Sequence, residues 1–584
     1  SGRQFLQSLL EEEFGCRVDP RRFHFVDHHF AHACSAYYPS GFDRTLVLTT
    51  DGVGDSLSGS LYTADDHRLE LLRTFAEEDS LGFFYLDVTR YLGFDLFDEY
   101  KVMGLAPYGN GERFEPVFAR LYELRPDGTY RFNRERMRRL WQDLPARPAG
   151  GELTQSDKDV AMAAQATLER IVHHVVAHAV RSTGHDRLCL AGGVALNCRM
   201  NGDLLRRGLV RQIFVQPAAH DAGLSLGAAL HVHHSSQQRP APRSRLRHVY
   251  WGGHCGSEAE IEALLRAWEV FVDWDRVPEP QAVVAKLMSE GTIVGWVHGR
   301  SEFGPRALGN RSILADPRPA VNKDVINALV KKREAFRPFA PSVLEEYAGE
   351  VFELPPGVES LPFMLVTVQV REQYREALGA ITHVDGSARV QTVSRADNPC
   401  YWSMIDGFRE LTGLPVLLNT SFNNFAEPIV ETAADALVCF LTTGLPVLAI
   451  DDWIVRKRPR PAGALASLRL RLPVYVKLHD RPLPADGAGA SLSARGQWWR
   501  RLRAHLAAWR SAPANGRVSQ VGNTFDWREY EIPDTLFRIL LASDGCRSVD
   551  ELMDDAGVCD TGARAACIDL IEELWERRLV TLTP

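Results

Sequence analysis

The stretch VDHHFAHACSAYYPSGF (26–42), followed closely by RTLVLTTDG (44–52), sets the fold class of this chain. The first run has the pattern of a helix. The second is apolar and rich in β-branched residues, which predicts a buried strand that ends at a carboxylate and a glycine. RLCLAGG (187–193) repeats the strand-then-glycine pattern after a long helical segment. Strands that alternate with helices in this way predict an α/β fold.

Two histidines in the first run, His28 and His32, are four residues apart, so on a helix they share one face. Two imidazoles placed in this way can hold one divalent metal ion. For an isolated pair, capping or packing against neighbours is the commoner explanation. His174 and His178 have the same spacing, but an apolar stripe already accounts for their helix, and we expect both to be solvated.

Two carboxylates distinguish the first pair from the second. Asp51 ends a strand just before a glycine, a position that commonly faces a phosphate or a metal. Asp221, in QPAAHDAGLSLGAAL, precedes a helix of small residues, where it can also serve as an N-cap. Two histidines and two aspartates form a ligand set that suits iron, manganese or zinc. The sequence therefore predicts a metal site at His28, His32, Asp51 and Asp221.

Changes of composition divide the chain into several units. A long amphipathic helix is expected at 157–180, with an N-terminal cap at Ser156 and Asp159. Further strands are expected at 292–299 and 415–422. The expected units are an α/β domain at 1–234, a linker at 235–247, a second α/β domain at 248–458, a linker or extension at 459–520, and a small helical, winged-helix-like module at 521–584.

The overall composition excludes several functional classes. The 584 residues are 45% hydrophobic and 24% charged, with a formal net charge of -8 and no dominant basic block, which argues against a nucleic-acid partner. No stretch approaches the apolar length that spans a bilayer. The 10 cysteines contain no CxxC pair and are expected to be reduced thiols. We therefore expect a cytoplasmic enzyme without a membrane or nucleic-acid partner.

Two further patterns indicate phosphate binding. In LAGGVALN (190–197) a strand runs into Gly192 and Gly193 and then a helix, where the backbone can approach an anion closely. A second group combines basic residues with glycines and phenylalanines, and arginine binds phosphate bidentately. A solvated basic face or a nucleic-acid groove would be the alternatives. The group comprises Arg300, Arg306, Arg311, Lys331, Lys332, Arg333, Arg337 and Arg389, with Ser421 and Asn423 in NTSFN (419–423).

Taken in chain order, seven motifs resemble the O-carbamoyltransferases of the nodulation and antibiotic-tailoring type, a family that includes the tobramycin, cephamycin and ansamycin carbamoyltransferases. The resemblance covers about residues 20–458, and its specificity comes from the order of the motifs. The motifs are HHFAHACSAYYPS, EYKVMGLAPYG, AGGVALN, HDAGLSLGAAL, GRSEFGPRALGNRSILADPR, FRPFAPSV and LNTSFN.

The resemblance implies an actin/Hsp70-type, Kae1-like domain that is truncated at its N-terminal side, followed by a YrdC-like domain. In this family the YrdC-like domain forms carbamoyladenylate from carbamoyl phosphate and ATP, with Mg²⁺ expected beside the ATP. The Kae1-like domain, with Fe²⁺ or another divalent metal, then transfers the carbamoyl group to an acceptor hydroxyl. We expect that acceptor to be a secondary metabolite, as in antibiotic biosynthesis.

The resemblance also implies roles for individual residues. The metal ligands correspond to His28, His32, Asp51 and Asp221. The catalytic contacts correspond to Arg306, Lys331 and Arg337, and the contacts to nucleotide and carbamoyl phosphate to Gly192, Gly193, Asn197, Arg389, Ser421 and Asn423.

Three alternatives stay open. A hydrogenase-maturation-like carbamoyltransferase would act on a protein thiol, but that family has the opposite domain order and zinc-finger cysteines. The tRNA threonylcarbamoyl machinery would need a basic surface. A non-catalytic ATP-binding scaffold would have no reason to keep both charged clusters. The C-terminal module resembles the PqqD-like domains that bind peptides or carrier proteins, and a homodimer is compatible with the sequence.

Overall fold

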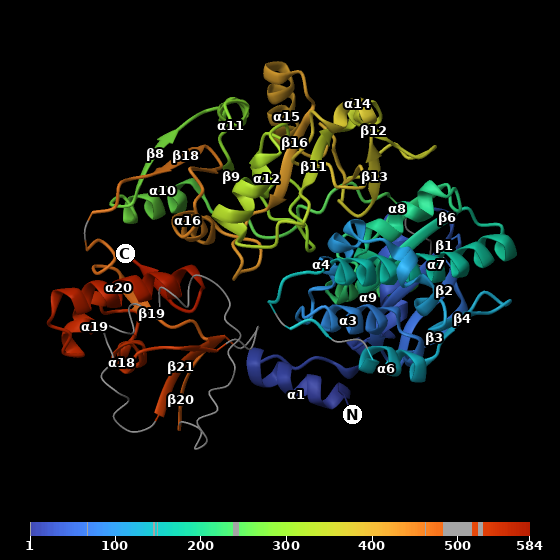
Figure 1. Ribbon diagram of the computed structural model, residues 1–584, viewed down its shortest axis with the longest axis horizontal. Helices are drawn as coiled ribbons and strands as arrows, with labels where there is room; N and C mark the ends of the chain where they lie inside the picture. Colours follow the sequence, from blue (N-terminus) through green and yellow to red (C-terminus); the bar gives the residue numbers. More distant parts are fainter. Residues whose placement is uncertain are drawn as a thin grey trace.

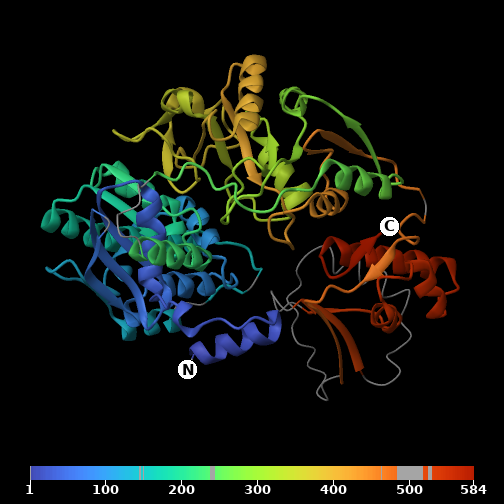
Figure 2. The same ribbon diagram turned by 180° about the vertical axis from the view of Figure 1, so that it is seen from behind.

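The computed structural model describes residues 2–66, 68–143, 146–148, 150–236, 244–461, 463–482, 517–523 and 529–584. Figures 1 and 2 show three bodies: an N-terminal lobe up to residue 236, a second lobe from 244 to 461, and a C-terminal module formed by the described residues from 463 onward. The mixed α/β prediction is confirmed. No helix within these ranges is long and apolar enough to cross a membrane.

The N-terminal lobe is built on a five-stranded sheet of order β3-β2-β1-β6-β7. β1 pairs antiparallel with β2 and parallel with β6, so the two halves of the sheet meet at the strand that carries Asp51. Leu46, Val47 and Leu48 are successive and all buried, and because their side chains alternate in direction, both faces of β1 are covered. The strands are β1 (Arg44–Gly54), β2 (Leu57–Asp65), β3 (Arg68–Ala76), β6 (Arg187–Ala191) and β7 (Gln212–Val215).

Helices cover this sheet and position the residues of interest. α2 packs against β1, β6 and α9, while α7 packs against α3, α4 and α8. The strands expected at 44–52 and 187–193 are confirmed as β1 and β6. The helices are α2 (His28–Ser40), α3 (Leu81–Tyr91), α4 (Glu99–Leu105), α7 (Gln155–Thr183), α8 (Cys198–Arg206) and α9 (Leu224–Ser236).

The longest helix, α7, corrects two details of the sequence analysis. It begins at Gln155 because Thr154 and Asp157 form a reciprocal capping box, so the cap expected at Ser156 and Asp159 was wrong. The expectation that His174 and His178 are solvated was also wrong. Nε2 of His174 lies 2.9 Å from the carbonyl oxygen of Arg125, and the ring of His178 packs where a side chain at Gly128 would stand.

The second lobe has an eight-stranded sheet of order β15-β11-β16-β10-β9-β17-β18-β8. The strands expected at 292–299 and 415–422 are confirmed as β9 and β16. Two helices, α11 (Pro280–Ser289) and α15 (Pro399–Thr412), pack against each other, and α16 (Ala433–Leu441) packs on β9 and β17. The strands are β8 (Val272–Arg276), β9 (Val294–Val297), β10 (Arg311–Ala315), β11 (Ala340–Leu344), β15 (Gln391–Val393), β16 (Val416–Ser421), β17 (Val447–Ile450) and β18 (Trp453–Lys457).

A smaller three-stranded sheet of order β12-β13-β14 adjoins the N-terminal lobe. It comprises β12 (Phe352–Glu353), β13 (Thr367–Val370) and β14 (Ser387–Arg389). Helix α8 packs against β13, with Gly202 against the backbone oxygen of Thr367, where a Cβ atom would lie 2.3 Å from that oxygen. This close approach requires glycine and fixes the junction of the two lobes.

The C-terminal module combines strands and helices from a wider range than 521–584. β19 pairs with β23, and β20 pairs with β21, so the segment 459–520, which was expected to be a linker or extension, contributes β19, β20 and the start of β21 to the module. The winged-helix-like and PqqD-like assignments stay predictions. The elements are β19 (Arg469–Arg471), β20 (Val476–Pro482), β21 (Arg517–Asn523), β22 (Glu529–Glu531), α18 (Asp534–Ala542), α19 (Val549–Asp555), α20 (Thr561–Glu576) and β23 (Thr581–Thr583).

Candidate active site

The four predicted metal ligands lie together in the N-terminal lobe. Nε2 of His32 is 3.1 Å from a carboxylate oxygen of Asp51 and 3.5 Å from one of Asp221. Nε2 of His28 is 3.5 Å and 3.7 Å from the same two oxygens. One ligand atom from each residue therefore falls within 4.8 Å of the other three. Residues more than 190 positions apart in the sequence converge on one point.

Local backbone structure positions each of these side chains. His28 is the first residue of α2, and its backbone N–H donates to Asp55 at 2.8 Å. Gly54 leaves room for the His28 ring, since a Cβ atom there would lie 2.1 Å from it. Asp51 stands near the end of β1, where one carboxylate oxygen accepts the N–H of Gly52 at 2.7 Å. The start of α2 and the end of β1 are thus fixed relative to each other.

The electrostatics of this cluster favour a bound cation. The Asp51 carboxylate raises the pKa of His28, although burial opposes the change. Burial alone would raise the pKa of Asp51, yet the adjacent rings of His28 and His32 hold it well below its usual value. His32 is fully buried, whereas the Asp221 side chain is 68% exposed, so the cluster opens to solvent on the Asp221 side.

The residues fit a divalent metal. In the described part of the chain, Nε2 of His28 and Nδ1 of His32 are buried without a hydrogen-bond partner. The four His–Asp pairs of ligand atoms are separated by 3.1 to 3.7 Å, and all four ligand atoms lie within 4.8 Å of one another. The cluster therefore has the donor types and the spacing that a metal ion requires.

The neighbouring histidine, His29, shows what a structural histidine looks like at the same helix start. Its two ring nitrogens lie 3.0 Å from the Thr49 hydroxyl and 3.0 Å from the Leu57 carbonyl oxygen. Burial lowers its pKa. Both nitrogens are therefore satisfied by groups outside the cluster, whereas Nε2 of His28 and Nε2 of His32 face the carboxylates of Asp51 and Asp221.

The predicted glycine turn lies directly against the cluster. Gly192 has φ +88°, and a Cβ atom there would lie 2.1 Å from the Thr50 carbonyl oxygen. At Gly193 a Cβ atom would come within 3.0 Å of the Asp51 carboxylate. Asn197 is engaged internally: its side chain caps α8 through Met200 N–H and exchanges hydrogen bonds with Gln165. The nucleotide contact implied for Asn197 stays a prediction.

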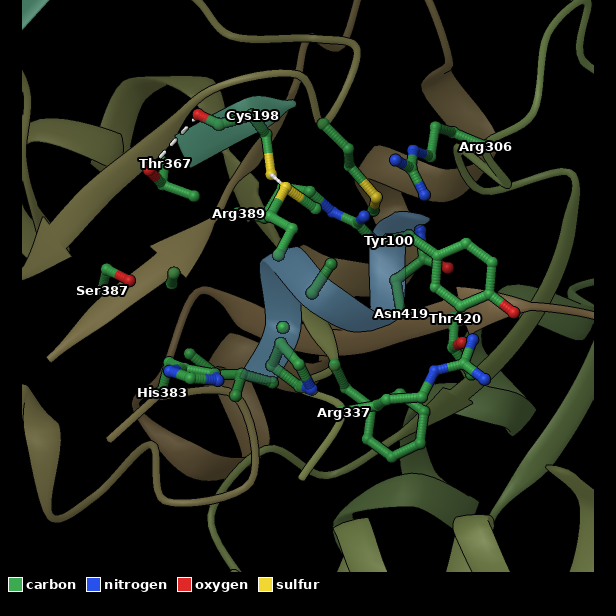
Figure 3. Close-up of a pocket in the computed structure, with 18 of the residues that line it drawn as sticks. Tyr100, Cys198, Arg306, Arg337, Thr367, His383, Ser387, Arg389, Asn419 and Thr420 are labelled. Atoms are coloured by element: carbon green, nitrogen blue, oxygen red, sulfur yellow. Dashed lines mark hydrogen bonds between the residues drawn. The ribbon is translucent and has the colours of Figure 1, made fainter. Parts of the chain in front are cut away.

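A second site is a cavity between the two lobes, of about 1060 Å³ with its open mouth included. Five residues of the predicted basic group line it: Arg306, Arg333, Arg337, Arg389 and Ser421. Figure 3 shows the labelled arginine side chains around the common space.

The other basic residues of the predicted group serve the fold. Arg311 is fully buried and donates to backbone oxygens, including those of His298 and Glu431. Arg300 donates to the backbone oxygens of Trp251 and Gly252. Lys332 pairs with Glu576 of the C-terminal module at 2.7 Å. Of the arginines in GRSEFGPRALGNR, only Arg306 lines this cavity.

Lys331 lies behind the cavity wall rather than along it. It ends a π-helical turn, Asn327–Lys331, and its side chain is buried. The ammonium group donates to the Ser421 hydroxyl at 3.1 Å, and to the Asn423 carbonyl oxygen at 3.0 Å and side-chain oxygen at 2.6 Å. Burial holds its pKa well below the usual value. Lys331 therefore shapes the loop that carries Ser421 and Asn423.

The cavity gathers more positive charge than the protein neutralises. Burial, with repulsion from Arg389, lowers the pKa of Arg306 to about 9. Burial and Arg337 do the same for Arg333. Nε of Arg306, Nε of Arg389 and Nη2 of Arg333 are buried without a hydrogen-bond partner among the described residues. Among the described residues, Arg337 is the one of these four arginines that forms an ion pair with a carboxylate, that of Glu334 at 3.6 Å. Anionic ligands would supply the missing acceptors.

Two family models match the chain: the carbamoyltransferase N-terminus over residues 3–230 and the carbamoyltransferase C-terminus over residues 285–457. The chain belongs to the carbamoyltransferase family. The nodulation protein NolO of Bradyrhizobium diazoefficiens is 48% identical over 96% of this chain and 97% of its own length. NolNO of Sinorhizobium fredii is 47% identical, covering 99% and 82%. A 3'-hydroxymethylcephem-O-carbamoyltransferase of Streptomyces clavuligerus is 32% identical, covering 58% and 61%.

This carbamoyltransferase also places residues at the cavity to which the sequence analysis gave no role. Tyr100 and Met103 on α4 and Cys198 at the start of α8 reach it from the N-terminal lobe. The Arg337 guanidinium lies over the Tyr100 ring, 4.5 Å from its centroid. The motif EYKVMGLAPYG contains Tyr100 and Met103, so the signal was present without a chemical interpretation.

The two sites of this carbamoyltransferase adjoin each other. The turn that carries Arg306 also contains Gly304, whose φ is +119° and where a Cβ atom would lie 3.1 Å from the Pro217 carbonyl oxygen. Pro217 stands four residues before Asp221. The backbone segment that leads into a predicted metal ligand thus touches the loop that carries a cavity arginine.

Proposed function

We propose that the cavity between the lobes forms carbamoyladenylate and that the adjoining His–Asp cluster serves the transfer of its carbamoyl group to a hydroxyl of a small-molecule acceptor. The observation that supports this most strongly is the group of partnerless guanidinium nitrogens at the cavity, next to a loop that touches the approach to Asp221. The arginine cavity suits two phosphate-bearing substrates, and the His–Asp cluster suits a cation.

The arginine cavity addresses the first half of the reaction. A carbamoyl group is a poor electrophile because its nitrogen donates into the carbonyl, and an adenylate supplies a good leaving group. Carbamoyl phosphate and ATP are both anionic and repel each other. Arg306, Arg337 and Arg389 would hold them in contact, which replaces a bimolecular encounter by a positioned one. Water cleaves carbamoyl phosphate to carbamate and phosphate. A carbamate oxygen then attacks the α-phosphorus of ATP, and pyrophosphate leaves as the mixed anhydride between carbamate and AMP forms.

The His–Asp cluster addresses the second half. His28, His32, Asp51 and Asp221 would hold a divalent metal, iron in our proposal, which supplies a Lewis acid for the carbamoyl carbonyl or a phosphate oxygen when it is bound. The turn at Gly192 and Gly193 would let the adenylate approach the backbone closely, next to this cluster. The AMP oxygen leaves as the acceptor oxygen bonds to the carbamoyl carbon, and the acceptor proton is released.

The acceptor class follows from the relatives. One relative is named for O-carbamoylation of a hydroxymethyl group on a cephem, and two are named as nodulation proteins. We therefore propose a hydroxyl acceptor of small-molecule size for this chain.

The test is to incubate the full chain with ATP, carbamoyl phosphate and a panel of alcohols and to follow pyrophosphate release and carbamate-ester formation. We expect pyrophosphate only when carbamoyl phosphate is present, because the carbamoyl donor is a substrate of the first step. Release of no pyrophosphate under any of these conditions would disprove the adenylation step. Pyrophosphate that forms equally well without carbamoyl phosphate would identify a plain ATP pyrophosphohydrolase instead.

A further inference from the structure

The loop after β16, residues 421–428 (hereafter the 421–428 loop), forms part of the cavity wall through Ser421 and is held from both ends by buried cations. Lys331 of the second lobe binds its beginning at Ser421 and Asn423. Arg578 of the C-terminal module binds its end: Nε donates to Glu427 at 2.6 Å and Nη2 at 2.9 Å. A residue from outside the two lobes thus contacts the loop that forms part of the cavity wall.

The Arg578–Glu427 pair differs from a surface ion pair. The two side chains are only 10% and 12% exposed. Arg578 also donates to the Thr442 hydroxyl at 3.1 Å and to the Trp575 carbonyl oxygen at 2.9 Å. Its φ is +58°, which directs the side chain out of the end of α20 into the second lobe. A bidentate, buried arginine fixes the orientation of a carboxylate in a way that a lysine does not.

Glu427 connects Arg578 to the rest of the loop through further hydrogen bonds. One of its carboxylate oxygens accepts the Asn424 N–H at 3.2 Å, and its backbone oxygen accepts the Asn423 side-chain N–H at 2.9 Å. Asn424 in turn donates through its side chain to the Glu576 backbone oxygen of α20 at 2.9 Å. The side-chain oxygen of Asn423 is an acceptor for both Lys331 and the Ser421 hydroxyl. An unbroken hydrogen-bonded chain thus links Arg578 to Ser421 at the cavity.

The interface around this chain is extensive and apolar at its centre. The Trp268 and Trp575 rings stack with centroids 6.0 Å apart and an interplanar angle of 4°. The ion pairs Lys332–Glu576, at 2.7 Å, and Arg460–Glu572 also cross this interface. Figure 1 shows α20 below the second lobe, on the side of α16. The module is therefore docked firmly enough for Arg578 to act on the loop.

We infer that the C-terminal module is a working part of the adenylation site and that Arg578 is a positioning residue, which holds the 421–428 loop so that Ser421 and the Lys331-bound Asn423 keep the cavity in shape. This inference rests on the proposed function for its kinetic consequence. It does not rest on it for the order of the loop itself.

The test compares Arg578→Met with Arg460→Ala in the full chain. Arg460 pairs with Glu572 across the same interface, and within the described part of the chain it forms no hydrogen bond or ion pair with the 421–428 loop, so its removal matches the loss of one interfacial arginine. We expect Arg578→Met to lower kcat for carbamoyl-phosphate-dependent pyrophosphate release by about ten- to a hundredfold, as misplacement of a positioning group does. Amide hydrogen exchange of residues 421–428 should become faster in Arg578→Met and stay unchanged in Arg460→Ala.

Arg578→Met leaves the buried carboxylate of Glu427 without its partner. The double variant Glu427→Gln/Arg578→Gln is therefore a second test, in which neither position carries an unpaired buried charge. It should also show faster exchange in the loop and a reduced kcat, with KM for ATP nearly unchanged, since the arginines that bind the phosphates remain. Loop exchange and kcat equal to those of Arg460→Ala in both variants would overturn the inference. Inactivity of the unaltered chain would instead disprove the proposed function. The exchange measurement would still show whether Arg578 orders the 421–428 loop.

Discussion

The His–Asp cluster and the arginine cavity are opposite in charge and in the way that they are assembled. Three residues of the cluster, His28, His32 and Asp51, come from one helix and the strand that follows it. More hydrogen-bond acceptors than N–H donors converge at this point. The cavity draws its arginines from well-separated segments of the second lobe and completes its wall with residues of the N-terminal lobe. One site is prepared for a cation, and the other for anions.

On the proposed function, this difference predicts that the two half-reactions depend on separate sets of residues even though the sites adjoin. A change in the cavity should affect formation of the activated carbamoyl group. A change in the cluster should affect only its use. If every variant impaired both steps equally, the contrast between the sites would be lost.

The largest effect is expected for Arg306→Ala. Removal of a phosphate-binding guanidinium from a buried site should reduce carbamoyl-phosphate-dependent pyrophosphate release by about a hundredfold or more. Arg409→Ala is the matched control, because Arg409 carries the same charge on α15 and pairs with Asp406 away from the cavity. Steady-state pyrophosphate assays on both variants measure the effect. A loss in the control as large as that in Arg306→Ala would show that the protein's overall charge, not the cavity, is responsible.

A selective effect is expected for His32→Ala. This variant should lower carbamoyl transfer to an acceptor by about a hundredfold, since a lost Lewis acid removes several kcal/mol of stabilisation, while pyrophosphate release persists. Bound metal, measured by elemental analysis after loading and desalting, should fall in parallel.

His174→Ala supplies the control for that comparison. His174 and His178 have the same spacing on α7, but the His174 ring is bonded to the Arg125 backbone. Metal content and transfer should stay at the level of the unaltered chain. A loss of metal in His174→Ala, with retention in His32→Ala, would place the metal on α7 instead of α2. The contrast between the His–Asp cluster and the arginine cavity would then no longer hold.

The sequence predicted the two sites unequally, for physical reasons. The ligands on α2 and β1 could be recognised because helix spacing and a strand end each determine where a side chain points. The glycine-rich segment around Arg306 has no such period, so residue spacing alone did not distinguish its three arginines. The family resemblance pointed to Arg306, and the structure places Arg311 inside the fold.

Lys331 and Cys198 illustrate the remaining limits. A π-helical turn ends at Lys331 and directs its side chain behind the wall, and a sequence pattern does not reveal that extra residue in the turn. Cys198 reaches the cavity only because α8 docks against the second lobe, a long-range contact that no local period encodes. The mixed α/β class and the main strands, in contrast, follow from local apolar patterns.

The smallest effect, and the one that refines the boundary between the sites, is expected for Asn197. Its side chain caps α8 and is bonded to Gln165, so Asn197→Ala should cost about 1 to 3 kcal/mol of stability and lower the thermal midpoint by a few degrees. Asn197→Asp keeps the oxygen that caps the helix and should lose less. KM for ATP should change by less than about threefold in both variants, a difference of under about 0.7 kcal/mol. A large rise in KM at an unchanged midpoint would mean that Asn197 turns outward to the nucleotide, as the family resemblance implies, and that the turn after β6 belongs to both half-reactions.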